Sequence, residues 1–469
     1  MVFSSPVFLF LFLPVVYLIY TLLPRKAKNY VLIAASLVFY AWGEPVYILL
    51  MIGSASVNYV LARVIGRGKS RRLWLALCVV FNIGMLLVFK YANFMVDNVN
   101  GIFGAQIMIP GIRLPIGISF YTFQAMSYVI DVYRGKNKAQ KNYANVLLYI
   151  SFFPQLIAGP IVKYHDIAAQ ISQRKETLEK TVSGLKRFAV GLGKKLLIAG
   201  AMGQAADMVF GLPGADVNIS VAWLGALTYA LQIYFDFSGY SDMAIGLAKI
   251  FGFDLKENFL YPYTAPSIKT FWRKWHVSLS TWFKEYLYIP LGGNRKGNVR
   301  TGLNLLIVFF CTGLWHGAQW TFVVWGFIHG AFILLERVGV LRPERWKPRF
   351  LGHIYTVLVA VVAFTVFRAD TLAQGFDFIG KMFAGYGGTP RISAILSETL
   401  TWKFGVFFVM ALIGATPLLK NAYKRICAKS ARAAAAADIT TSVLAIALLA
   451  VCMMSLASQT YNPFIYFRF

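Results

Sequence analysis

Long apolar stretches separated by short basic clusters run along the whole chain. Apolar residues make up 58% of its 469 positions and charged residues only 14%, whereas a water-soluble chain carries about 25% charged residues. In lipid, the backbone polar groups are satisfied within helices. A helix that spans the membrane takes about 20 residues, so the pattern predicts an all-α polytopic membrane protein with about 10–12 transmembrane helices.

The basic residues set the predicted orientation. Lysine and arginine number 46 against 19 acidic residues, a net charge of +27. In a soluble protein this excess would suggest a nucleic-acid partner. Here most of it lies between apolar runs, as expected of cytoplasmic loops, so no nucleic acid is expected. Residues 1–23 have no basic leader or cleavage site and are expected to be a first span. Both termini are then predicted to lie outside the cytoplasm. The basic clusters fall at 25–28, 67–72, 134–141, 163–195, 256–300, 337–349 and 420–432.

If neighbouring basic clusters both lie in the cytoplasm, the chain between them must cross the membrane an even number of times. Two of the gaps between clusters are too short for two full spans. Residues 142–162 return to the cytoplasmic side through a Pro- and Gly-containing turn, which predicts a re-entrant hairpin. In the second gap, 301–336, a first arm over 303–315 would rise only about 20 Å. That is short of the roughly 30 Å hydrocarbon core, so His316 is expected at the turn, at membrane depth.

Histidines are the main candidates for chemistry. His316 lies in the apolar run GLWHGAQW, and polar groups within the membrane are functional by default. His276 lies in FWRKWHVSLSTWFKEYLY. Read as one helix over 271–288, this segment places an apolar stripe against charged residues, which is typical of an interfacial helix. His276 fits either a functional role or the polar face of that helix.

The other polar residues in apolar surroundings are predicted to be supporting ones. His329 is 13 residues after His316, so one straight helix would point the two apart. Asp236 and Asp242 fit a cation site or a structural hydrogen bond, and the structural role is favoured because no set of metal ligands accompanies them. No metal is expected, and the four cysteines form no disulfide or zinc pattern.

Two long motifs carry a family resemblance. FWRKWHVSLSTWFKEYLYIPLGGN and, after it, GLWHGAQWTFVVWGFIHG are similar to those of the membrane-bound O-acyltransferases. The likeness is strongest to the branch that acetylates alginate or cellulose, which includes peptidoglycan acetylation systems. It runs along essentially the whole chain, so residues 1–469 are expected to form one membrane domain. Within it, residues 254–300 are expected to form a cytoplasmic or interfacial segment.

The resemblance implies a fold and a pair of site residues. The fold is a ring of transmembrane helices with re-entrant segments around a tunnel, here in the bacterial inner membrane. The family's near-invariant histidine matches His316, and its partner, a histidine or asparagine, matches His276. His316 is then assigned as the general base. His276 would orient the attacking hydroxyl or stabilise the developing charge. His329, Trp315 and the two aspartates are expected to support them.

The implied donor is acetyl-CoA, used as a substrate rather than as a bound cofactor. A neutral, buried imidazole can take a proton from an attacking hydroxyl near neutral pH. Basic side chains suit the phosphates of coenzyme A, although anchoring of cytoplasmic loops explains them equally well. The candidates for this contact are Arg273, Lys274, Arg295 and Lys296.

The resemblance also implies how acetyl reaches an outside polymer. In related envelope systems a C-terminal aromatic motif with a tyrosine is thought to relay the acyl group. FIYFRF, within the predicted extracytoplasmic segment 458–469, resembles that motif and makes Tyr466 the candidate relay. The expected partners are a periplasmic O-acetyltransferase subunit of the SGNH type, an exopolysaccharide biosynthesis and secretion complex, and membrane lipid. A transporter of an acyl carrier or polysaccharide precursor, without chemistry of its own, is the alternative.

Overall fold

The computed structural model describes residues 1–387 and 389–458, and every regular element in those ranges is a helix. This confirms the all-α fold. Six of the described helices are long and apolar enough to cross a membrane. The number rises to seven if the bent pair Arg391–Thr399 and Trp402–Gly414 counts as one span. Shorter apolar helices, such as Phe8–Leu22, account for part of the difference from the larger number predicted.

The chain divides into two compact units. Unit 1 comprises Met1–Phe188 and Met243–Lys256. Unit 2 comprises Ala189–Asp242 and the chain from Glu257 onward. Helices α10 (Leu178–Gly193) and α12 (Ile219–Ile250) contribute residues to both. The prediction of a single domain over 1–469 stays a prediction.

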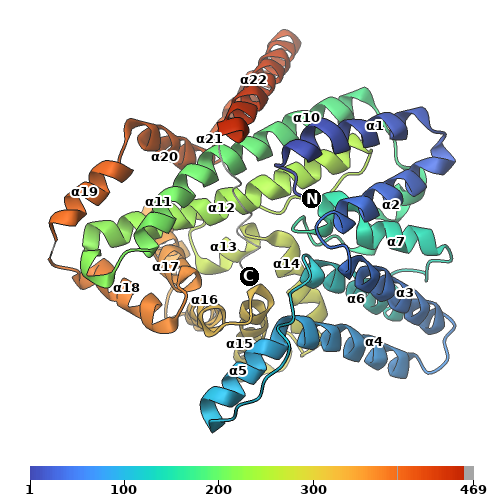
Figure 1. Ribbon diagram of the computed structural model, residues 1–469, viewed down its shortest axis with the longest axis horizontal. Coiled ribbons are helices and arrows are strands. Elements are labelled where there is room, and N and C mark those ends of the chain that lie inside the picture. Colours follow the sequence, from blue (N-terminus) through green and yellow to red (C-terminus); the bar gives the residue numbers. More distant parts are fainter. Residues whose placement is uncertain (388, 459–469) are drawn as a thin grey trace. The chain divides into compact units, whose positions relative to one another are not determined.

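Unit 1 contains the N-terminal helices (Figure 1). Helices α3, α4 and α6 pack against one another, and α2 packs against α7. Buried Asn58 of α3 and Asn82 of α4 exchange amide hydrogen bonds of 3.2 and 2.9 Å, the kind of polar contact that joins helices in membranes. The helices of this unit are α1 (Leu13–Leu22), α2 (Arg25–Ala41), α3 (Tyr47–Gly66), α4 (Arg71–Leu86), α5 (Ala92–Phe103), α6 (Ile118–Tyr133), α7 (Tyr143–Ser151), α8 (Phe153–Leu156) and α9 (Tyr164–Gln173).

The segment expected to be re-entrant contains only short helices. Helix α7 has nine residues and α8 has four, and both are buried. Neither reaches the roughly 20 residues of a full span, in agreement with the prediction that 142–162 does not cross twice. Its re-entrant path in a membrane stays a prediction.

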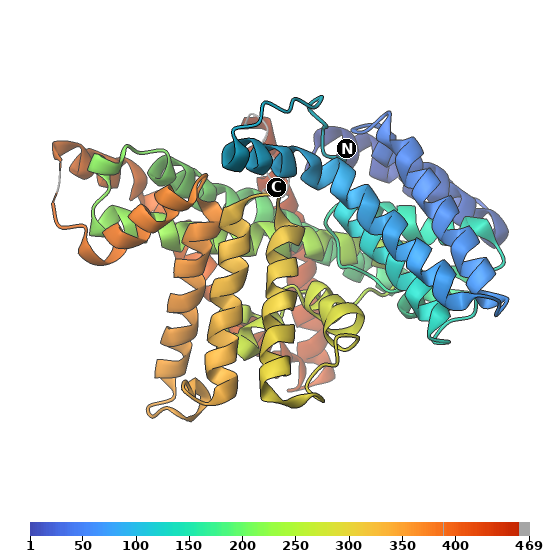
Figure 2. The same cartoon turned by 90° about the horizontal axis from the view of Figure 1, so that it is seen from below.

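Unit 2 is built around three adjacent helices, α15, α16 and α17, which stand side by side in Figure 2. Helix α13 packs against α16 and α17. The other helices of this unit are α11 (Gly200–Phe210), α13 (Ile268–Lys274), α14 (Val277–Phe283), α18 (Leu372–Ala384), α19 (Pro390–Thr399), α20 (Trp402–Gly414), α21 (Leu418–Cys427) and α22 (Ala431–Ser458). The three central helices are α15 (Gly297–His316), α16 (Trp320–Val338) and α17 (Phe350–Arg368).

The short first arm predicted over 303–315 is wrong. Helix α15 begins at Gly297 and has 20 residues, so at 1.5 Å per residue it is about 30 Å long, enough to cross the membrane. The first turns carry Asn298 and Arg300, whose exposed side chains do not end the helix. Both α15 and α16 qualify as spans, so 301–336 needs no re-entrant turn.

Candidate functional site

The predicted helix over 271–288 is broken at His276. Helix α13 ends at Lys274, and α14 starts at Val277. His276 lies between them with φ +42°, in the left-handed region. That conformation costs an L-residue about 1–2 kcal/mol. The members of the expected apolar stripe are all buried within the protein, and they are Trp272, Trp275, Leu279, Trp282 and Tyr286.

Two glutamates anchor the start of α13. Glu336 of α16 accepts hydrogen bonds from the backbone N–H groups of Ile268 and Lys269, at 2.7 and 3.0 Å. Ser267 caps the same turn and donates to Glu344 at 2.8 Å. This hydrogen bond holds the pKa of Glu344 below its usual value. The helix that carries Trp272 is therefore tied to α16.

Asn258 holds the turn at His276. Its Oδ1 accepts from the Ser278 backbone N–H at 3.1 Å and from the Ser278 hydroxyl at 2.9 Å. The His276 Nδ1 lies 3.3 Å from the same oxygen. Because that oxygen can only accept, Nδ1 carries the proton when the ring is neutral. Burial lowers the pKa of His276 to about 3, so the ring is neutral and its Nε2 presents a lone pair.

The indole ring of Trp315 contacts the rings of both His316 and His276. The Trp315 ring centroid is 5.7 Å from that of His276 and 5.0 Å from that of His316. Both histidines are buried, with 0% and 5% of their surfaces exposed. His316 ends α15, and the rings of Trp325 and Phe367 contact it at 5.0 and 5.3 Å. The structure therefore brings three of the predicted residues together in an apolar enclosure.

His329 joins the same cluster. It lies on α16, which is a separate helix from α15, so the expectation for one straight helix does not apply. Its ring is 5.1 Å from Trp325, and Trp325 contacts His316. On the other side it contacts Trp272 at 5.3 Å. His329 thus belongs to the surroundings of His316, as a supporting role requires.

The two aspartates form ion pairs with lysines of a π-helical turn, Lys194–Ala199. Lys195 Nζ lies 2.5 Å from an Asp236 oxygen, with both side chains almost fully buried. Lys194 Nζ lies 2.6 Å from Asp242. A buried carboxylate needs such a partner. Ion pairing with lysines is compatible with the structural role favoured from the sequence, which stays a prediction.

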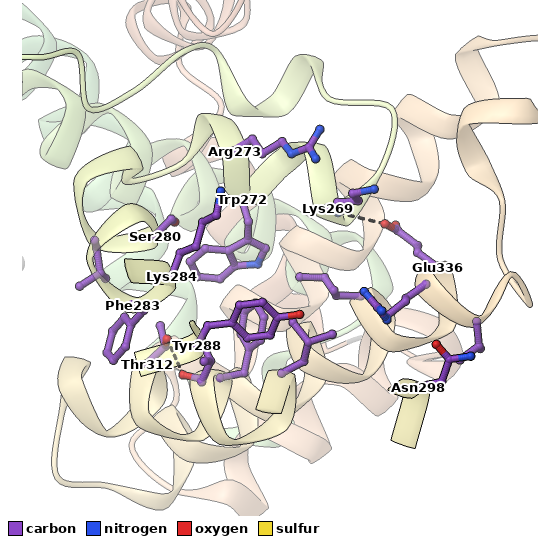
Figure 3. Close-up of a pocket in the computed structure, with 17 residues that line it drawn as sticks. Lys269, Trp272, Arg273, Ser280, Phe283, Lys284, Tyr288, Asn298, Thr312 and Glu336 are labelled. Carbon is purple, nitrogen blue, oxygen red and sulfur yellow. Dashed lines mark hydrogen bonds between the residues drawn. The ribbon is translucent and has the colours of Figure 1, made fainter. Parts of the chain in front are cut away.

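Figure 3 shows a cavity of about 840 Å³ whose lining includes Trp272. The Trp272 ring also contacts His329, at 5.3 Å. The walls of the cavity come from α13, α14, α15 and α16, together with the turn around Tyr288. The Trp272 ring projects into the middle of the lining side chains. Four of these lining residues are basic, namely Lys269, Arg273, Lys284 and Arg337, against the single acid Glu336. A cavity with this balance attracts anionic ligands.

The structure places one of the four predicted phosphate contacts at this cavity. Arg273 lines it. Lys274 instead donates to the Thr264 hydroxyl at 3.0 Å, and burial lowers its pKa. Arg295 and Lys296 are exposed and are not among the lining residues. Lys269, Lys284 and Arg337 were missed, because they belong to the same basic clusters and nothing in the sequence separates cavity residues from anchoring ones.

Tyr466 and the rest of FIYFRF lie outside the described residues. The relay assignment and the segment 458–469 therefore stay predictions.

Residues 137–373, which include both motifs and the cavity, match the profile of the membrane-bound O-acyltransferase family. The chain belongs to this family. Members of the family are acyltransferases, and this one, with its long apolar helices, is a multi-pass membrane protein. The transporter alternative is therefore wrong for this O-acyltransferase.

Three relatives show where in the family the chain falls. It is 40% identical to the probable alginate O-acetylase AlgI of Azotobacter vinelandii, over the whole of both chains. It is 33% identical to the peptidoglycan O-acetyltransferase of Helicobacter pylori, over 100% of this chain and 98% of that one. It is 26% identical to the teichoic acid D-alanyltransferase of Bacillus subtilis, over 53% and 65%. The protein is thus an acyltransferase of the membrane-bound O-acyltransferase family, most similar in this set to polymer O-acetylases.

Proposed function

We propose that the protein transfers acetyl from cytoplasmic acetyl-CoA toward an exopolysaccharide outside the inner membrane, alginate or cellulose in class. The observation that carries this proposal is the contact of His316 and His276 with the same indole, that of Trp315, near a cavity with four basic side chains. Full-length similarity to an enzyme named for alginate O-acetylation supports the polymer class.

The cavity supports the choice of donor. Coenzyme A carries several phosphate charges, and Arg273, Lys269 and Arg337 supply cations at the cavity rim. Its inner wall is apolar, formed by side chains such as Phe309 and Leu305, which suits the less polar end of a thioester. The cavity would hold acetyl-CoA with its phosphates at the basic rim.

The two histidines have different roles in the proposed reaction. The acceptor hydroxyl attacks the thioester carbonyl and gives its proton to His316. The carbon–sulfur bond then breaks, and the thiolate receives that proton, which leaves an acetyl ester and free coenzyme A. His276, neutral with Nδ1 protonated toward Asn258, offers Nε2 as an acceptor. Of the two roles that the sequence left open, this geometry favours orienting the hydroxyl.

The route to the polymer uses the C-terminus. Tyr466 would accept acetyl and pass it to a periplasmic transferase of the SGNH type within a polysaccharide secretion complex. This follows from the predicted outward C-terminus and from the FIYFRF motif.

The decisive experiment replaces His316 by alanine. A positioned general base contributes about 100- to 10,000-fold to rate, so transfer from radiolabelled acetyl-CoA should fall at least about 100-fold. The matched control is His353→Ala, because His353 is exposed on α17. Transfer at the wild-type rate in the His316→Ala protein would refute the assignment.

A further inference from the structure

The cavity faces of α15 and α16 continue into the histidine cluster. On α15 the cavity is lined by Leu305, Phe309 and Thr312 among others. His316 follows Thr312 by four residues and therefore lies on the same helix face. On α16, Ile333 lines the cavity, and His329 precedes it by four residues. The helix faces that line the cavity therefore also carry the two histidines, one turn further along each helix.

Trp272 belongs both to the cavity lining and to the ring cluster around His329. Its ring lines the cavity and packs against Phe309 of α15 at 5.1 Å. It also contacts Trp325 at 5.7 Å and His329 at 5.3 Å. Trp325 in turn contacts the ring of His316 at 5.0 Å. The Trp272 indole therefore lies next to both the cavity and the rings that surround the predicted base.

Trp272 and the two rings that it contacts, Trp325 and His329, carry buried nitrogen atoms that form no hydrogen bond with the described residues. The Nε1 atoms of Trp272 and Trp325 have no hydrogen-bond partner within residues 1–387 and 389–458, and neither does either ring nitrogen of His329. Indole Nε1 can only donate, and a neutral imidazole donates once and accepts once. Such atoms are costly to bury unpaired. A carbonyl oxygen placed among them would accept from the N–H groups.

We propose that Trp272, Trp325 and His329 form the acyl subsite of the cavity, and that the Trp272 indole restricts the donor to a short acyl chain. The subsite takes a thioester: its carbonyl oxygen pairs with the N–H groups, and its alkyl end stops against the indole rings. This rests on the proposed function, since the cavity must hold an acyl-CoA. It adds a selectivity role for Trp272 and a carbonyl-binding role for His329.

The test measures binding to the purified full-length protein in lipid nanodiscs. The ligands are coenzyme A and unreactive acetyl-, butyryl- and hexanoyl-CoA analogues in which a methylene replaces the thioester sulfur. In a shaped apolar pocket a single methylene is worth about 10- to 200-fold in selectivity. Trp272→Ala should therefore shift the ratio of butyryl to acetyl affinity by about tenfold or more toward butyryl. Trp272→Phe should give a smaller shift in the same direction.

A matched control is Trp282→Ala, because Trp282 is a buried tryptophan of α14 that does not line the cavity. It should keep the wild-type ratio. His329→Phe should reduce the preference for the acetyl analogue over coenzyme A, which lacks the acyl carbonyl. Wild-type ratios in both Trp272 variants, or an unchanged preference in His329→Phe, would overturn the proposal. If the wild-type protein binds none of these ligands, the donor assignment itself is wrong, which is a separate result.

Discussion

At the scale of single residues, the site depends on atoms that the motifs do not contain. His276 and His316 stand out in the sequence because they are polar residues in apolar, aromatic segments. Asn258 does not, since it lies 18 residues before His276 in an ordinary polar stretch. Only the folded chain brings its oxygen to the His276 ring, at 3.3 Å. The two histidines could be named as candidates from the sequence, but the residue that contacts the His276 ring could not.

Asn258→Asp tests this orientation through pH. With Asn258 in place, His276 has a pKa of about 3 and stays neutral across pH 5–8. A carboxylate at position 258 favours the protonated ring and raises that pKa. Since protonation removes the Nε2 lone pair, transfer activity in the variant should fall as the pH drops toward 5.

The measurement is the pH profile of kcat/KM for acetyl transfer. Asn294→Asp is the matched control, because Asn294 is exposed in the loop before α15. Superimposable profiles for Asn258→Asp and the wild-type protein would show that Asn258 does not act through His276.

At the scale of elements, the apolar runs of the sequence predicted the helices, but they did not predict where the helices break. The basic clusters mark the ends of the long apolar helices, but several of them are themselves helical, as at α10 and α21. The break at His276 depends on Asn258 and Ser278, which are tertiary contacts, so the regular apolar spacing over 271–288 concealed it. The early start of α15 was missed because Arg300 and its polar neighbours were interpreted as part of a loop. Charged residues in a first helical turn can reach out of the lipid without ending the helix.

Glycines let α15 and α16 approach closely enough to position His316. A Cβ on Gly326 would collide with the carbonyl oxygen of Phe309, and one on Gly313 with that of Phe322. Gly326→Ala should therefore separate the helices and cost about 1–3 kcal/mol of stability, as overpacking does. We expect a lower thermal unfolding midpoint together with reduced acetyl transfer.

Gly380→Ala provides the comparison. Gly380 lies within α18, and a Cβ there meets nothing within 4 Å. Alanine at such a site should be neutral or stabilising by about 0.4–1 kcal/mol. Equal unfolding midpoints for the two variants would mean that the close approach of α15 and α16 does not matter.

At the scale of the whole molecule, the positive-inside rule predicts which ends of the helices face the cytoplasm. The basic residues of the cavity belong to the clusters at 256–300 and 337–349 that the positive-inside rule assigns to the cytoplasm. An entrance on that side would meet acetyl-CoA where it is made. The proposed mechanism requires this orientation.

Cysteine labelling in intact cells tests the orientation. The protein is first freed of its four native cysteines, and a single cysteine is introduced at Asn294 or at Ser393, both exposed. A membrane-impermeant maleimide added outside should label Ser393→Cys, with access through the outer membrane provided. Asn294→Cys should react only after the inner membrane is opened. The reverse pattern would invert the predicted topology.

Tyr466→Phe tests the relay that the orientation makes possible. Removal of the phenolic oxygen leaves no atom to carry acetyl, so polymer O-acetyl content should fall to background while the amount of membrane protein is unchanged. Tyr461→Phe keeps the length and aromatic character of the same segment and should retain acetylation. Wild-type acetylation in the Tyr466→Phe strain would exclude the relay.

The left-handed backbone at His276 also limits what evolution can place there. Besides glycine, asparagine, aspartate and histidine enter this region most readily among residues. Of these, histidine and asparagine offer a neutral acceptor atom at the end of the side chain. The family motif allows histidine or asparagine at this position. These are the two residues that meet both requirements, a left-handed backbone and a side-chain lone pair. The backbone conformation at position 276 therefore restricts which residues can replace His276.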